Sequence, residues 1–146
     1  MRKSIIFLFS FLIFQLFALD IVVPENPHRY EKMAAEELLE ALHKCKVADI
    51  RITDAKSAKF PAIYLKSRTS EGNNEAWQLK SDGKNLQITG SSPIGTLYGV
   101  YALLLKAGVY FIAWDESVYP DLSKWELPVL DESASPAFSG RQIFNR

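Results

Sequence analysis

The sequence predicts an α/β domain of the α+β type, a two-layer sandwich in which two helices cover one face of a mixed β-sheet. Two segments carry apolar residues at helical spacing, and several short runs between and after them have strand character. The predicted element order is β-α-β-β-β-β-α-β, which is typical of a sheet with one helical layer. With 146 residues, one such domain can bury a substantial core.

The first half of the chain predicts a strand at residues 20–23 and a helix that starts at Pro27. Asn26 suits the capping position of this helix, and proline suits its first position because the N–H missing there needs no partner. Glu40 and Lys44 are correctly placed for an i,i+4 ion pair. The apolar positions that define the buried stripe of this helix are Tyr30, Ala34, Leu38, Ala41, Leu42 and Cys45.

The middle of the chain predicts four strands. Residues 50–53 and 62–65 have strand character and are separated by a polar stretch. Residues 76–80 and 85–89 alternate apolar and polar side chains around Asp82 and Gly83, the pattern of a β-hairpin.

The second helix follows, with Ser92 as its cap, Pro93 in the first position and Gly108 after its end. A glycine inside a helix costs about 1 kcal/mol relative to alanine, so Gly99 predicts that another backbone passes close to the helix. The spacing of Gly90, Gly95 and Gly99 matches neither a dinucleotide-binding fingerprint nor a phosphate-binding loop. The predicted buried stripe is Ile94, Leu97, Tyr98, Tyr101, Leu104 and Leu105.

After the second helix the sequence predicts one last strand at residues 109–113. An extended tail follows from Tyr119 to Pro136, punctuated by prolines and without clean alternation. We expect this tail to have few packing partners of its own.

The N-terminal 19 residues are predicted to be a signal peptide. Arg2 and Lys3 form a positive n-region, and an apolar stretch shorter than a membrane span runs to Phe17, so we expect cleavage near Ala18 and export to the periplasm or the outside of the cell. The formal net charge is zero and the basic residues are not clustered, which argues against nucleic acid or a membrane surface as the partner of the mature chain.

The residues supply no recognisable catalytic set, metal site or cofactor site. Asp115 and Glu116 are the obvious carboxylate pair for glycoside hydrolysis, but neighbours on a strand point to opposite faces. Glu36 and Glu37 are expected to be solvated, and His28 and His43 lack metal-ligand spacing. Cys45, the only cysteine, ends an apolar stripe and is predicted to be a buried, inert thiol.

Three stretches of the chain form recognisable motifs: the run GSSPIGTLYGVY at residues 90–101 with GVYF at 108–111, the strand and helix within residues 21–38, and PAFSGR at residues 136–141. Together they resemble the small α/β domain that precedes the catalytic barrel in bacterial glycosidases such as β-hexosaminidases (their domain 2) and α-glucuronidases (their N-terminal domain). The resemblance implies a domain at residues 20–135, with residues 136–146 beginning a catalytic (β/α)8 barrel. It also implies that Arg141 contacts hydroxyl groups of the terminal sugar, a task that suits the fixed donors of a guanidinium.

The function implied by this resemblance is that of a non-catalytic accessory domain of an exported glycoside hydrolase, with the barrel as its partner and carbohydrate as its ligand. A barrel needs roughly 250 residues, so we expect no hydrolysis by this chain alone. The alternative is a free-standing exported module that binds glycan or protein through aromatic side chains. The aromatic residues considered for that role, for which core packing is the competing explanation, are Tyr110, Phe111, Trp114, Tyr119 and Trp125.

Overall fold

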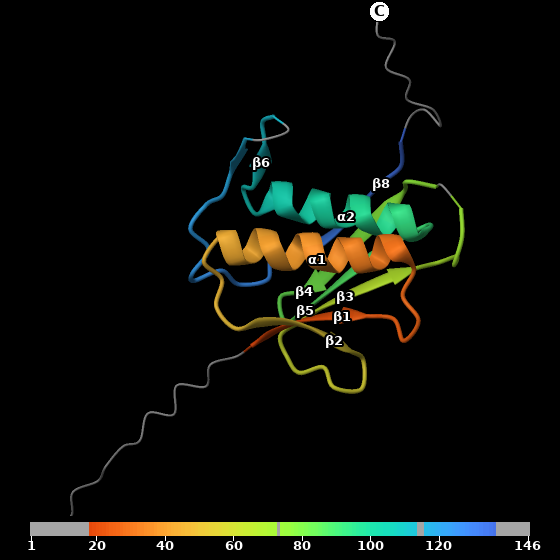
Figure 1. Ribbon diagram of the computed structural model, residues 1–146, viewed down its shortest axis with the longest axis horizontal. Helices are drawn as coiled ribbons and strands as arrows, with labels where there is room; N and C mark the ends of the chain where they lie inside the picture. The colour runs from red at the N-terminus through yellow and green to blue at the C-terminus, as the bar shows by residue number, and fades with distance from the viewer. Residues whose placement is uncertain (1–17, 73, 114–115, 137–146) are drawn as a thin grey trace, which may run out of the picture.

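The computed structural model describes residues 18–72, 74–113 and 116–136. Two helices lie side by side over one face of a six-stranded sheet (Figure 1). The helices are α1 (Arg29–Lys44) and α2 (Pro93–Lys106). The strands are β1 (Leu19–Val23), β2 (Ile50–Asp54), β3 (Ala62–Ser67), β4 (Trp77–Asp82), β5 (Asn85–Gly90), β6 (Tyr110–Phe111), β7 (Ser117–Val118) and β8 (Val129–Ala134).

The main sheet has the strand order β2-β1-β3-β5-β4-β8. Strands β2, β1, β3 and β5 are parallel, whereas β4 is antiparallel to both β5 and β8. The sheet is therefore mixed, and the predicted α+β sandwich is confirmed. The predicted hairpin at Asp82 and Gly83 joins β4 to β5, with Gly83 at a φ of 87°.

The core lies between the helices and one face of the sheet. The largest fully buried side chains come from both layers and include Leu38, Leu42, Leu103 and Leu104 from the helices and Ile21, Ile63, Leu79, Leu86 and Ile88 from the strands. Among the described residues, no helix has the length and apolar character needed to cross a membrane.

Helix α1 begins two residues later than the sequence predicts. Its N-cap is His28, whose Nδ1 accepts a hydrogen bond from the Tyr30 N–H at 3.2 Å. The carboxylate of Glu31 accepts the His28 N–H at 2.8 Å and closes a capping box. The assignment of Asn26 as the cap and Pro27 as the first residue was therefore wrong, because a histidine imidazole performs the capping that the short polar side chain was expected to perform.

Helix α2 buries a different face from the one predicted. Of the predicted stripe, Leu104 is buried as expected, but Leu105 is exposed and the other four residues, Ile94, Leu97, Tyr98 and Tyr101, are only half-buried. Small residues permit a close approach of this helix to the sheet, so the sheet-facing stripe combines them with a few branched side chains. The buried residues of α2 are Pro93, Gly95, Thr96, Gly99, Val100, Leu103 and Leu104.

The glycines of α2 do lie at close contacts, but Gly99 faces side chains rather than a backbone. A methyl group built on Gly99 would lie 2.6 Å from Ile88 Cγ2 and 3.4 Å from Trp77 Cβ. The close backbone is found at Gly95, against the carbonyl oxygens of Ala76 and Asn74. The hydroxyl of Ser92 donates to the Asn74 carbonyl at 2.8 Å, so its side chain does not cap the helix as predicted.

The end of the described chain corrects two further predictions. Residues 109–113 do not join the main sheet, since β6 is a two-residue strand paired only with β7. The tail, in contrast, packs well: Leu127 is buried, and β8 pairs with β4 along its whole length. Proline at position 128 does not prevent this, because it precedes the strand and needs to donate no ladder hydrogen bond.

Candidate functional site

The sheet face opposite the helices is polar, and we call it the helix-free face. Strand register places alternate residues of β3, β5, β4 and β8 on it. One row across these strands contains Lys66, Thr89, Gln78 and Ser133, and the next row contains Tyr64, Gln87, Lys80 and Asp131. Lys66, Lys80, Gln87, Asp131 and Ser133 are exposed, and the other three are half-buried.

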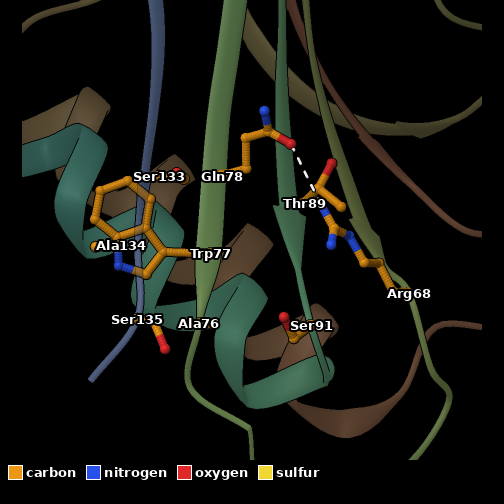
Figure 2. A pocket seen from close by; sticks show the side chains of 9 residues that line it. All are labelled: Arg68, Ala76, Trp77, Gln78, Thr89, Ser91, Ser133, Ala134 and Ser135. Carbon is orange, nitrogen blue, oxygen red and sulfur yellow. Dashed lines mark hydrogen bonds between the residues drawn. The ribbon is translucent and has the colours of Figure 1, made fainter. Parts of the chain in front are cut away.

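Adjoining shallow cavities run along this face and form what we call the trough. The central cavity, of about 360 Å³, is lined by residues of β3, β5 and β4 together with Arg68. A second, of about 420 Å³, shares Lys80 and Gln87 with it and extends toward β8. A third, of about 340 Å³, shares Arg68, Gln78 and Thr89 and lies at the other end (Figure 2).

Hydrogen bonds orient the side chains of the trough. Arg68 Nη2 donates to Gln78 Oε1 at 3.4 Å, the contact drawn in Figure 2, and Lys66 Nζ donates to Gln87 Oε1 at 3.2 Å. Gln78 Nε2 donates in turn to Asp131 Oδ1 at 3.2 Å. Both amide oxygens are thus directed toward cations, so the central cavity presents mainly hydrogen-bond donors.

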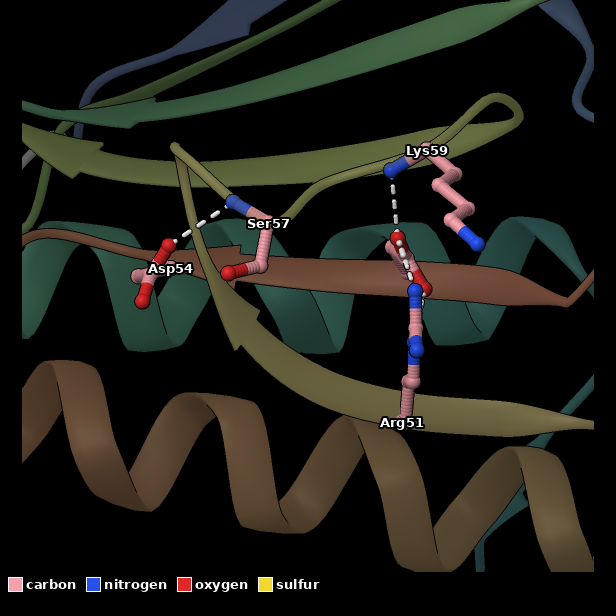
Figure 3. A network of polar contacts seen from close by, with 5 residues as sticks. Arg51, Asp54, Ser57 and Lys59 are labelled. Atoms are coloured by element: carbon pink, nitrogen blue, oxygen red, sulfur yellow. Dashed lines mark hydrogen bonds and ion pairs between the residues drawn. The ribbon is translucent and has the colours of Figure 1, made fainter.

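A buried carboxylate, that of Asp20, lies on the helix-free face at strand β1. Asp20 is fully buried and accepts from Arg51 Nε at 2.7 Å and from Arg51 Nη2 at 3.1 Å. The backbone N–H of Lys59 donates to the same carboxylate, and Figure 3 labels both partners of this carboxylate, Arg51 and Lys59. The hydrogen bonds from Arg51 lower the pKa of Asp20 below its usual value, so it stays ionised.

A second buried carboxylate, Glu31, lies on the helix side of the sheet. Besides capping α1, Glu31 accepts the hydroxyl hydrogen of Ser67 at 2.7 Å. The Ser67 hydroxyl oxygen also lies 2.9 Å from that of Thr96, which donates to the Lys66 carbonyl at 2.9 Å. This network links the first turn of α1 to the end of β3 and the first turn of α2.

These two carboxylates cannot act together on a substrate. Asp20 lies opposite Ala62 at the start of β3, and Glu31 contacts Ser67 at its end. Five residues of strand separate the two positions by about 16 Å, and they lie on opposite faces, whereas retaining glycosidases place their carboxyl groups about 5 Å apart. In the part of the chain that the structure describes, no three His, Cys, Asp or Glu side chains are grouped as a metal site.

The sequence-predicted site residues fall partly outside the described residues. Arg141, Asp115 and Trp114 all lie outside them. Glu116 is exposed in the turn before β7, where its carbonyl accepts the N–H groups of Ile112 and Ala113 at 3.0 Å each. The geometry of the Asp115–Glu116 pair therefore stays a prediction.

The four described aromatic candidates divide into two pairs. Tyr119 and Trp125 pack against the core, as the packing explanation expects. Tyr110 and Phe111 are 57% and 43% exposed, and Phe111 contacts Tyr101 edge-on with ring centroids 5.4 Å apart. Only the β6–β7 hairpin therefore offers an aromatic surface from this set.

Two smaller predictions agree with the structure. Cys45 is a buried free thiol. Burial raises the pKa of this thiol, so a smaller fraction of it is present as the reactive thiolate. Lys44 and Glu40 form the predicted ion pair at 2.6 Å.

Sequence reasoning missed both buried carboxylates and the trough. The sequence contains the capping-box spacing from His28 to Glu31. It was missed because the motif is usually recognised by a serine or threonine at the N-cap, not by a histidine. The polar alternation of β3, β4 and β5 was also visible. The tertiary structure decides which face of the sheet the helices leave uncovered. The alternation of polar residues in these strands could therefore not identify the helix-free face.

No protein-family model matches this chain, and no curated protein does. Solved structures do match it. A GH138 enzyme targeting pectin rhamnogalacturonan II is similar with a TM-score of 0.50 and 21% identity, over 62% of this chain and 10% of the enzyme. The Flavobacterium johnsoniae chitobiase of family GH20 is similar with a TM-score of 0.50 and 16% identity, over 84% of this chain and 18% of the chitobiase.

At these identities the similarity shows a shared fold and nothing finer. In both cases the matching region is less than a fifth of a much larger glycoside hydrolase. The chain thus has the fold of a small segment found in two glycoside hydrolases from different families.

Proposed function

We propose that this chain is a non-catalytic accessory domain of an exported glycoside hydrolase, with a catalytic (β/α)8 domain as its partner. The observation that carries the proposal is that the same α+β fold forms a minor part of two larger glycoside hydrolases of different families. In this proposal residues 136–146 lead into the barrel, and Arg141 binds sugar hydroxyls there.

The use of the buried acidic groups supports a non-catalytic role. A general acid or nucleophile in a glycosidase needs a carboxyl group that is free to meet substrate. The carboxylate of Asp20 accepts hydrogen bonds from Arg51 and the Lys59 N–H. The carboxylate of Glu31 accepts hydrogen bonds from the Ser67 hydroxyl and the His28 N–H. Both carboxylates therefore make hydrogen bonds within the fold and are not free to meet a substrate.

The experiment is a hydrolysis assay on the purified chain without its leader. We expect no release of chromophore from aryl glycosides of N-acetylhexosamine or glucuronic acid. Turnover that disappears in Asp115→Asn or Glu116→Gln would contradict the proposal, because it would make that pair catalytic. As an independent check, the reading frame downstream of Arg146 should encode alternating strands and helices over roughly 250 residues.

The alternative function, a free-standing exported binding module, is favoured by one observation. Tyr110, Phe111, Ile112 and Val118 are all at least 43% exposed on the β6–β7 hairpin, and exposed apolar clusters mark interaction sites. A reading frame that ends at Arg146, together with binding lost in Tyr110→Ser and Phe111→Ser, would support this alternative over the accessory domain.

A further inference from the structure

The central cavity of the trough has an excess of positive charge, whereas the second cavity, toward β8, is lined by Asp82 and Asp131 beside Lys80. The central cavity is lined by three cations, Lys66, Arg68 and Lys80, and by no acidic residue. The whole chain, in contrast, has equal numbers of acidic and basic residues. A local excess of positive charge on a neutral protein favours an anionic ligand.

The neighbouring hydrogen bonds strengthen this preference. The side-chain oxygen atoms of Gln78 and Gln87 accept hydrogen bonds from Arg68 and Lys66, so these two acceptors of the cavity are already engaged by its cations. Lys80 and Asp131 form a 3.5 Å ion pair, and their side chains are 67% and 59% exposed. Such a pair is weak and screened by solvent, so Lys80 can bind another anion at little cost.

The shape of the trough indicates an extended polymer rather than a compact anion. The cavities share lining residues and are shallow, so they form a continuous surface and not an enclosed pocket. Lys66 on β3 and Lys80 on β4 are separated by strand β5. Strands lie about 4.8 Å apart, so the two ammonium groups start from backbones about 10 Å apart, roughly two pyranose rings of a linear glycan.

We propose that the trough binds a linear carboxylate-bearing glycan, with Lys66, Arg68 and Lys80 pairing with its uronate groups. Arg68 offers paired N–H donors that match a carboxylate, and the two lysines act as point charges. The choice of a glycan among polyanions rests on the proposed function, whereas the anionic character rests on the trough alone.

The test compares two probes that differ in charge. Calorimetric titration of the chain at low ionic strength uses an oligogalacturonate and a malto-oligosaccharide of equal length, both α-1,4-linked. We expect binding of the oligogalacturonate only, weakening as NaCl is added. The variant Lys66→Gln/Arg68→Gln/Lys80→Gln should lose about tenfold or more in affinity, because charge-assisted hydrogen bonds are removed.

A matched control changes the same number of charges elsewhere. Lys32, Lys44 and Lys124 are exposed and lie outside the trough, and the triple Gln variant at these positions should bind within about twofold of the parent chain. Circular dichroism and the thermal midpoint confirm that both variants fold. Equal binding of the neutral probe, no binding of either probe, equal loss in the control variant, or tighter binding of a single-stranded oligonucleotide would each overturn the inference. None of these results bears on the hydrolysis assay, which tests the proposed function.

Discussion

Glycine at position 99 is required by a neighbouring side chain. Its Cα faces Ile88, which is fully buried in the central strand β5. Ile88 Cγ2 is attached to a β-branched carbon with restricted rotation, so it cannot move aside easily. The glycine lowers the intrinsic stability of the helix, but it allows the helix to pack closely on the sheet.

The variant Gly99→Ala tests this contact. Alanine should gain about 1 kcal/mol of helix propensity, yet the methyl group would lie 2.6 Å from Ile88 Cγ2. We expect a net loss of about 1–3 kcal/mol in the free energy of unfolding, measured with urea. Gly95→Ala should cost more, because a backbone carbonyl faces that position. A stabilised Gly99→Ala protein would show that the helix and sheet can separate without cost.

The buried ion pair of Asp20 predicts a pH dependence of stability. The pKa of Asp20 is lowered in the folded state, chiefly by hydrogen bonds from Arg51. A lowered folded pKa gives stabilisation that is present above the unfolded value of about 3.9 and lost as the pH falls through the folded pKa. Asp20→Asn should cost about 1–3 kcal/mol near neutral pH. This cost should shrink below about pH 4 in urea unfolding experiments.

An exposed pair provides the control for this experiment. Asp121 and Lys46 lie 2.8 Å apart, but their side chains are 54% and 70% exposed. Because solvent screens the pair, Asp121→Asn should leave the unfolding free energy nearly unchanged at every pH. If both variants followed the same pH profile, the effect could not be assigned to the burial of Asp20.

At the scale of elements, β8 decides how the sheet ends. Without it, β4 would be the edge strand, and its unpaired backbone groups would be open to other chains. Strand β8 covers that edge and itself carries the acidic residues Asp131 and Glu132. Glu132 forms an ion pair with Lys106 at 2.6 Å, which connects the edge strand to the last turn of α2.

Two neighbouring residues of β8 should respond differently to the same substitution. Leu130 is half-buried against the core, whereas Val129 is 78% exposed. We expect Leu130→Ser to lower the free energy of unfolding by about 1–2 kcal/mol, from lost apolar burial. Val129→Ser should change it by less than about 0.5 kcal/mol. Equal effects in thermal or urea unfolding would mean that β8 does not dock on the core through Leu130.

At the scale of the whole molecule, the first strand lies directly after the predicted leader. Leu19 is buried, and its N–H donates to the Asp49 carbonyl at 2.9 Å. Asp20 follows with its ion pair to Arg51. Cleavage at Ala18 would therefore retain all of β1, whereas cleavage beyond Asp20 would remove a buried charge partner.

Because β1 begins at Leu19, we predict cleavage after Ala18, one residue before the end of the 19-residue leader predicted from the sequence, so that the exported protein begins at Leu19. N-terminal sequencing of protein recovered from the periplasm or the medium should find Leu19 as the first residue. A species that retains Met1 would indicate an uncleaved anchor. A terminus after Asp20 would be expected to lower the thermal midpoint, because Arg51 would lose its partner.

The sequence by itself determined the fold class and the elements from β1 to α2, but not β6, β7 and β8. Helical periodicity located α1 and α2, alternation located β4 and β5 with the turn at Gly83, and Cys45 was correctly placed in the core. These features depend on residues close together in the chain, where propensity and periodicity act. The same local rules failed for α2, because the most apolar stripe of that helix is not the one that meets the sheet.

Only the tertiary structure decided which residues share a site. The burial of Asp20 depends on Arg51 from β2 and Lys59 from the loop before β3, and that of Glu31 depends on Ser67 at the end of β3. The trough exists because both helices pack on the same face and leave Lys66, Arg68 and Lys80 together on the other. Strand order and helix placement are set by long-range packing, and no spacing within the sequence encodes them directly.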